Sequence, residues 1–296
     1  MRGWWRDLTD LVLPTDCAGC GAPRTLLCPR CRAALSGRGP RRVRPVPEPA
    51  GLPVVHAAAP YAEEVRTLLL AHKERGALAL AGALGTALAG AVRAGLDGSG
   101  AGCAGASTGG RRSGAARFRP VLLVPVPSAR WAVRARGHDP VRRMALAAAG
   151  ELRRTGTPAR VAAVLRQRRA VADQAGLDAR QRLANLAGAL EVTAGGDQLL
   201  RAGHVVLVDD LITTGASLAE AARVVRKVAE ERTGGGTTVY GAVTREGRDE
   251  RRIGARPESR KWVHGAPEKA ALNTLGHALH AAVIAAPRDS FEIDRN

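Results

Sequence analysis

Short apolar runs and longer amphipathic segments alternate through the second half of the chain. The apolar run at 204–208 is rich in β-branched residues, which is typical of a strand buried on both faces of a sheet. Strands that alternate with helices indicate right-handed crossovers and an α/β fold with a doubly wound, mainly parallel sheet. In such a sheet, ligands bind beyond the carboxyl ends of the strands. The predicted strands are 121–126, 161–165, 204–208 and 237–243, and the predicted helices are 137–154 and 217–231.

The rest of the pattern predicts smaller units around this domain. Trp4 to Leu13 has helical spacing, and Leu272, Leu275, Leu279 and Val283 recur at intervals of three to four residues in an otherwise charged tail. The second of these patterns predicts a helix over 268–285 that docks on the body or on a protein partner. The predicted units are 1–35 (a helix and a cysteine module), 36–60 (a Pro-rich linker), 61–93 (helical), 94–119 (a flexible Gly/Ser/Arg insertion), 120–244 (the α/β domain) and 245–296 (the charged tail).

Charge and composition favour ligands that contain phosphate and argue against a membrane-spanning or secreted protein. The formal net charge of the 296 residues is +18, and most of this excess lies in residues 111–190, a belt that attracts phosphates of small molecules or of nucleic acids. A solvated surface rich in arginine is the alternative explanation of the belt. We expect no membrane span, because no run of about 18 uncharged apolar residues occurs. The few, clustered cysteines and the absence of a secretory signal pattern predict a cytoplasmic protein.

The stretch Val205 to Ser217 carries the most informative chemistry. A buried strand brings Asp209 and Asp210 to its carboxyl end, where two carboxylates suit the hydroxyls of a ribose, directly or through a divalent cation. The loop that follows enters a helix, whose N–H groups, dipole and neighbouring hydroxyls favour a phosphate. Its residues are Leu211, Ile212, Thr213, Thr214, Gly215, Ala216 and Ser217. Ser217 and Glu220 predict a capping box at the helix start. The alternative is an ordinary strand-to-helix turn with a capping serine.

Two CxxC motifs form a module near the N-terminus. Cys17, Cys20, Cys28 and Cys31 have the spacing of a closed, tetrahedral Zn²⁺ site, which is structural rather than catalytic. A redox-active pair and an iron–sulfur cluster are the alternatives that the spacing leaves open. Cys103 lies in the 94–119 insertion and is expected to take no part.

The run of four apolar residues, two acids and a Thr/Gly loop resembles the PRPP-binding signature of type I phosphoribosyltransferases. This resemblance implies that fold, with PRPP as the ligand and Mg²⁺ as its companion ion. It further implies that the loop after the first core strand receives the pyrophosphate, and Arg130, Arg134 and Arg136 are the candidates there.

The order of motifs over 11–35, 61–93 and 120–244 is similar to that of the ComF/GntX family. The cysteine module, the P-V-P strand end, an Arg-rich loop and a Q-x-G-L-x-x-x-x-R-x-x-N segment precede the PRPP signature. The family usually has R-G-F-N-Q where this chain has R-G-H-D-P at 136–140. By position, 166–185 corresponds to the mobile loop that closes phosphoribosyltransferase sites, with Arg168, Gln174 and Arg182 as candidate contacts.

Two functions of different classes follow from this resemblance. The first is an enzyme that transfers a phosphoribosyl group from PRPP and releases pyrophosphate. The second is an accessory protein of DNA uptake and competence that binds single-stranded DNA and uses the pocket to sense a ligand without catalysis. A regulator that responds to PRPP is a third hypothesis. No segment of the sequence identifies an acceptor for the first.

Overall fold

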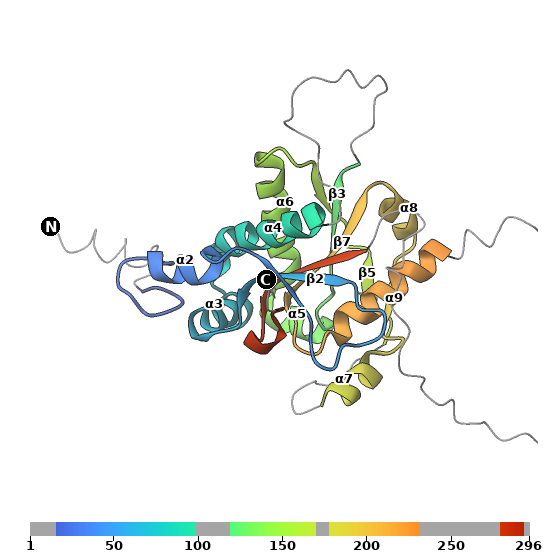
Figure 1. Cartoon of the computed structure of the whole chain (residues 1–296), viewed down its shortest axis with the longest axis horizontal. Coiled ribbons are helices and arrows are strands. Elements are labelled where there is room, and N and C mark those ends of the chain that lie inside the picture. Colours follow the sequence, from blue (N-terminus) through green and yellow to red (C-terminus); the bar gives the residue numbers. More distant parts are fainter. Residues whose placement is uncertain (1–15, 99–118, 170–177, 231–278, 293–296) are drawn as a thin grey trace, which may run out of the picture.

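A six-stranded sheet forms the centre of the molecule (Figure 1). The computed structural model describes residues 16–98, 119–169, 178–230 and 279–292. The strands are β1 (Arg41–Val43), β2 (Val54–Pro60), β3 (Val121–Pro125), β4 (Ala159–Val161), β5 (Leu165–Gln167), β6 (Leu190–Val192), β7 (His204–Leu211) and β8 (His280–Ala286). The helices are α2 (Pro29–Ser36), α3 (Glu63–Glu74), α4 (Ala81–Gly98), α5 (Arg130–Arg136), α6 (Pro140–Arg154), α7 (Ala179–Leu186), α8 (Gly196–Arg201) and α9 (Ala216–Glu230), with 3₁₀ turns at Leu78–Leu80 and Arg288–Ser290.

The sheet is mostly parallel, which confirms the α/β class. Its strand order is β1-β2-β8-β7-β3-β4, and only β1 runs antiparallel to its neighbour. A separate antiparallel pair, β5 and β6, forms a small second sheet. All carboxyl ends of the parallel strands therefore meet at one edge, where a ligand site is expected.

Helices cover both faces of the sheet (Figure 1). Along β7, Val206 and Val208 join a core with α2, α3, α4 and α6, whereas Val205 and Leu207 join a core with α9 on the opposite face. This alternation is the ordinary consequence of the two-residue period of a strand. Because both faces are covered, the inner strands β3 and β8 are buried along their whole length.

Helix α4 packs against α6 with its backbone close to that of its neighbour. A Cβ atom added at Gly85 would lie 2.8 Å from the backbone nitrogen of Ala148, so glycine permits this approach. Within the described residues, the stretch Leu78–Gly98 is long and apolar enough to cross a membrane, but more than half of its apolar part is buried inside the protein. It serves as a core helix, and no membrane span is indicated.

The prediction of a helix over 268–285 was wrong where the structure describes it. Residues 280–286 form β8, which lies between β2 and β7 and is buried along its whole length. The sequence H-A-A-V-I-A-A is a continuous apolar run of small and β-branched residues, as in a strand covered on both faces. The spacing of Leu279 and Val283 fitted a helix only by coincidence.

The prediction of a linker over 36–60 was also wrong in part. Val54–Pro60 is an inner strand of the sheet, and Arg41–Val43 is its antiparallel edge. The Pro and Gly residues that suggested a linker lie mostly between these two strands. The α/β unit therefore extends beyond 120–244 at both ends.

The predicted strand at 161–165 was wrong, because Val161 ends β4, Leu165 begins β5, and the residues between them belong to neither strand. The remaining predictions differ from the structure at their ends or concern residues that it does not describe. The predicted helices at 137–154 and 217–231 correspond to α6 and α9, and α4 continues to Gly98, into the proposed insertion. The predicted helix at Trp4–Leu13, Cys103 and the predicted strand at 237–243 lie outside the described residues.

Candidate functional site

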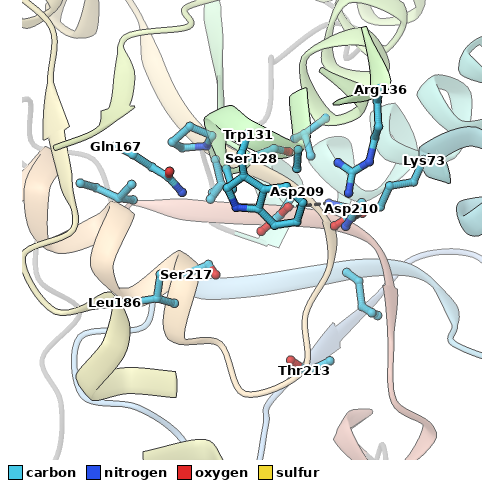
Figure 2. A pocket seen from close by; sticks show the side chains of 17 residues that line it. Lys73, Ser128, Trp131, Arg136, Gln167, Leu186, Asp209, Asp210, Thr213 and Ser217 are labelled. Atoms are coloured by element: carbon cyan, nitrogen blue, oxygen red, sulfur yellow. Dashed lines mark hydrogen bonds and ion pairs between the residues drawn. The ribbon is translucent and has the colours of Figure 1, made fainter. Parts of the chain in front are cut away.

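A cleft of about 380 Å³ opens at the carboxyl ends of β3 and β7 (Figure 2). Its polar side chains come from elements that are far apart in the sequence. They are Lys73 of α3, Ser128, Arg136 of α5, Gln167 of β5, Asp209 and Asp210 of β7, Thr213, and Ser217 of α9. Apolar walls come from Val126, Trp131, Leu186 and Leu190, among others.

The two acids predicted from the sequence both line this cleft. Asp210 is 8% exposed, and Asp209 is half-buried beside it. The Asp209 carboxylate accepts a hydrogen bond from the backbone N–H of Asp210 at 2.9 Å, which fixes its orientation. Burial raises the pKa of Asp209 well above its ordinary value of 3.8, and the charge of Asp210 raises it further. The pair is therefore poised to bind a cation or hydroxyl groups.

Lys73 is a site residue that sequence reasoning missed. Its Nζ lies 2.7 Å from Oδ2 of Asp210 and forms an ion pair across the cleft. Burial lowers the pKa of Lys73, but the charge and hydrogen bond of Asp210, together with Asp209, raise it by more, so its pKa lies above the ordinary value. The lysine is therefore charged at neutral pH.

The arginines predicted for the pyrophosphate loop separate into two groups. Arg136 lines the cleft, and Glu74 holds its guanidinium through two hydrogen bonds of 2.9 Å. Arg130 and Arg134 are exposed and do not line the cleft. The segment that carries them is the short helix α5, which ends at Gly137 with φ +73°. Only one helical face can turn inward, and Trp131, Ala132 and Arg136 lie along it.

The loop between β7 and α9 borders a small hollow of about 30 Å³ next to the cleft. Gly215 has φ +75°, a conformation that favours glycine, and a Cβ there would lie 3.1 Å from Leu52. The first N–H groups of α9 have no acceptor within their own helix, and its first turn contains no acidic side chain. Together these features form the N-terminus of a long helix beside hydroxyl side chains, which is a favourable setting for an anion.

The predicted capping box of Ser217 and Glu220 was wrong. Helix α9 already begins at Ala216, and Glu220 is buried. Its carboxylate accepts hydrogen bonds from Arg223 at 2.7 and 2.8 Å and from the backbone N–H of Leu190 at 3.4 Å. Glu220 therefore anchors the β5–β6 hairpin on α9 instead of capping the helix.

The β5–β6 hairpin and α7 form one wall of the cleft. Gln167, Leu186 and Leu190 line it, and Arg182 lies 3.4 Å from the Thr213 hydroxyl. Arg168, which directly follows β5, lines a different cavity, with Arg223 and Lys227. Gln174 lies outside the described residues.

Substitution of Asp209 by asparagine is expected to stabilise the ligand-free protein at neutral pH. A group with a raised folded-state pKa contributes stability that is present below its unfolded pKa of about 3.9 and is lost as the pH rises through the folded value. Asp209→Asn should therefore raise Tm by about 2–4 °C at pH 7, the shift expected from about 1 kcal/mol, and by less near pH 4. Thermal unfolding in magnesium-free buffer measures this effect. Asp97→Asn, at an exposed site, is the control, and a lower Tm of Asp209→Asn at every pH contradicts the expectation.

The four cysteines of the N-terminal module converge on one point. Their sulfur atoms all lie within 4.8 Å of one another, and all four thiols are free of disulfides. Backbone N–H groups of Cys28 and Cys31 donate to the sulfurs of Cys17 and Cys28, each at 3.4 Å. Burial raises the pKa of Cys17, but hydrogen bonds from backbone N–H groups lower it by more, to about 6. This donor set fits a metal ion such as Zn²⁺.

The cysteine module packs directly on α3. A Cβ at Gly19 would lie 2.7 Å from the Cys31 sulfur and 3.3 Å from Leu68 of α3. Arg30 also pairs with Glu64 of α3 at 2.6 Å. The cysteine cluster therefore supports the first half of the helix whose last turn carries Lys73 and Glu74.

Comparisons with known proteins give no further assignment. The chain matches no protein-family model and no curated protein. Its function must therefore be argued from the cleft and the residues that form it.

Proposed function

We propose that this protein binds PRPP with Mg²⁺ in the cleft and transfers the phosphoribosyl group to an acceptor with release of pyrophosphate. The main support for the proposal is that three features line the same cavity. These are the acid pair at the end of β7, the hydroxyl loop at the start of α9, and two cations, Lys73 and Arg136. We further propose a ComF-like relationship, a structural zinc ion at the four cysteines and a cytoplasmic location.

Each part of PRPP has a chemically matched partner in this proposal. The 5-phosphate binds at Thr213 to Ser217, where helix N–H groups and hydroxyls favour an anion. The ribose hydroxyls bind at Asp209 and Asp210. The diphosphate lies toward Lys73 and Arg136, whose charges stabilise it as a leaving group. The acceptor enters between Trp131 and the hairpin wall.

The acid pair fits a hard divalent cation, because carboxylate oxygens are the ligands that Mg²⁺ prefers. When bound there, Mg²⁺ would supply charge neutralisation of the diphosphate. The protein's own residues position the ribose, hold the diphosphate oxygens and exclude water through the apolar wall of Leu186 and Leu190. During transfer, the bond from ribose C1 to the diphosphate oxygen breaks, a bond from C1 to the acceptor forms, and the acceptor loses a proton. Catalysis of this kind depends on orientation and electrostatics more than on a strong base.

Calorimetric titration with PRPP and Mg²⁺ tests the proposal. Wild-type protein is expected to bind, and Asp210→Asn is expected to bind at least about 100-fold more weakly, because a buried carboxylate that holds the ligand is lost. Asp97→Asn is the matched control and should bind normally. Pyrophosphate release is then measured over a panel of acceptors. Absence of binding by wild-type protein at millimolar PRPP rejects the proposal, and binding without release for any acceptor restricts it to ligand binding.

A second candidate, binding of single-stranded DNA, is supported by α5. Trp131 is 63% exposed, and the exposed Arg130 and Arg134 belong to the same short helix. Aromatic rings and arginines together suit single-stranded nucleic acid, by base stacking and phosphate contacts. Binding of an oligonucleotide that weakens with salt and falls about tenfold in Trp131→Ala would favour this function.

A further inference from the structure

The residue that supplies the positive charge at the acid pair, Asp209 and Asp210, is of a type that is rare in this chain. Nearly all basic residues are arginine, and the lysines are Lys73, Lys227, Lys261 and Lys269. Among the described residues, the side chain that forms an ion pair with Asp210 is nevertheless a lysine. An ammonium group is a compact point charge, whereas a guanidinium is a planar fork. A compact cation beside a carboxylate can occupy the position of a metal ion and neutralise part of the negative charge there.

The two cations of the cleft differ in how firmly they are held. Arg136 is fixed by two hydrogen bonds from its guanidinium to Glu74. Lys73 has one bond, to Asp210, and 34% of its side chain is exposed, against 11% for Asp210. Lys73 can therefore leave the carboxylate by rotating its side chain, while Asp210 stays in place.

A divalent cation and Lys73 compete for the same carboxylate. Two positive charges within a few ångströms of each other repel strongly in a partly buried site. A ligand with a diphosphate removes this conflict, because it offers the displaced ammonium several oxygens to bind. Arg136, on the same side of the cleft, would hold the diphosphate beside it (Figure 2).

We propose that Lys73 takes the place of the divalent cation at Asp210 in the ligand-free protein and transfers to the diphosphate when cation and ligand bind. The transfer to the diphosphate rests on the proposed function, whereas the cation-like position at Asp210 does not. Lys73 then makes the acid pair a poor site for a metal ion alone and a good site for the metal with its ligand. The cleft thereby selects the metal–diphosphate complex over either component.

Two binding measurements on the zinc-loaded protein test the proposal. Binding of Mn²⁺ alone tests the position of Lys73 at Asp210, and binding of magnesium pyrophosphate tests its transfer to the diphosphate. In Lys73→Met, Mn²⁺ measured by electron paramagnetic resonance should bind at least about fivefold more tightly, because the competing charge is gone. Magnesium pyrophosphate, measured by calorimetry, should bind at least about fivefold more weakly, because a contact to the diphosphate is lost. Arg66→Met removes an exposed charge from the same helix outside the cleft and should change neither affinity. Affinities that do not move in opposite directions in Lys73→Met overturn the exchange.

Acylation of the wild-type protein provides a test that needs no variant. Mn²⁺ alone should increase modification of the Lys73 amine, and addition of pyrophosphate should decrease it, as measured by mass spectrometry with Lys227 as the internal reference. Unchanged labelling of Lys73 overturns the proposal. If wild-type protein binds neither pyrophosphate nor PRPP, the proposed function fails. In that case the Mn²⁺ titration tests only whether Lys73 occupies the place of a divalent cation at Asp210. Tighter Mn²⁺ binding by Lys73→Met supports this part of the proposal, and equal or weaker binding overturns it.

Discussion

A chain truncated after residue 244 is expected not to fold. The truncation removes β8, which pairs with β2 on one side and β7 on the other. Without it, β2 and β7 each lose one neighbouring strand. Removal of the buried side chains of Ile284 and Val283 also leaves a cavity in each of the two cores. The backbone N–H of Ile212 also loses its acceptor, the carbonyl of Ala285, at the start of the loop between β7 and α9. The loss should exceed the total stability of a typical domain, about 5–15 kcal/mol.

Circular dichroism and thermal unfolding measure this result. Truncation after residue 292 retains β8 and serves as the control, with a Tm expected close to that of the full chain. Ile284→Ala gives a graded version of the same test and should cost about 2–5 kcal/mol. Cooperative unfolding of the chain truncated after 244 would show that β8 is dispensable for the sheet.

Substitution of Cys31 by serine is expected to abolish the proposed zinc binding and to loosen the N-terminal module. Cys31 is fully buried, and its sulfur lies within 4.8 Å of the other three sulfurs. Structural Zn²⁺ sites contribute their binding free energy to folding, so the module should unfold locally. We expect the zinc content measured by mass spectrometry to fall from about one per chain to near zero. Tm should fall by about 5–10 °C.

Cys103→Ser is the matched control for this substitution, because Cys103 is remote in sequence from the four-cysteine cluster. It should retain both zinc and the original Tm. Ligand affinity should fall in Cys31→Ser as well, because α3 loses support at the end opposite Lys73. A Cys31→Ser protein with full zinc content would show that three cysteines suffice.

The strands that sequence analysis identified are those with bulky β-branched residues. Residues 121–126 and 204–208 are of this kind, and they became β3 and β7. β2 and β8 were missed because alanine dominates them, and alanine does not favour strands over helices. Their strand conformation is stabilised by pairing with distant segments, since His280 of β8 pairs with Val54 of β2 and with Val206 of β7. No local pattern contains these partners.

The acid pair and the loop between β7 and α9, which border the same cleft, were predictable as neighbours because they are contiguous in the sequence. Lys73 was not, since its contact with Asp210 joins residues that are 137 positions apart. Its rarity among arginines was a usable signal, although only the structure connects it to the acids. Arg130 and Arg134 were predicted as contacts from the family resemblance and from their place after the first core strand, and in the structure they are exposed and do not line the cleft.

The central position of β8 has a consequence for biosynthesis. A growing polypeptide on the ribosome contains β2, β3 and β7 long before residues 280–286 emerge. Until then, the edges of β2 and β7 that pair with β8 have no hydrogen-bond partner. Unpaired edges invite association with other chains, and such long-range parallel pairing is slow. Nascent chains of this protein should therefore depend on chaperones until residues 280–286 have left the ribosome.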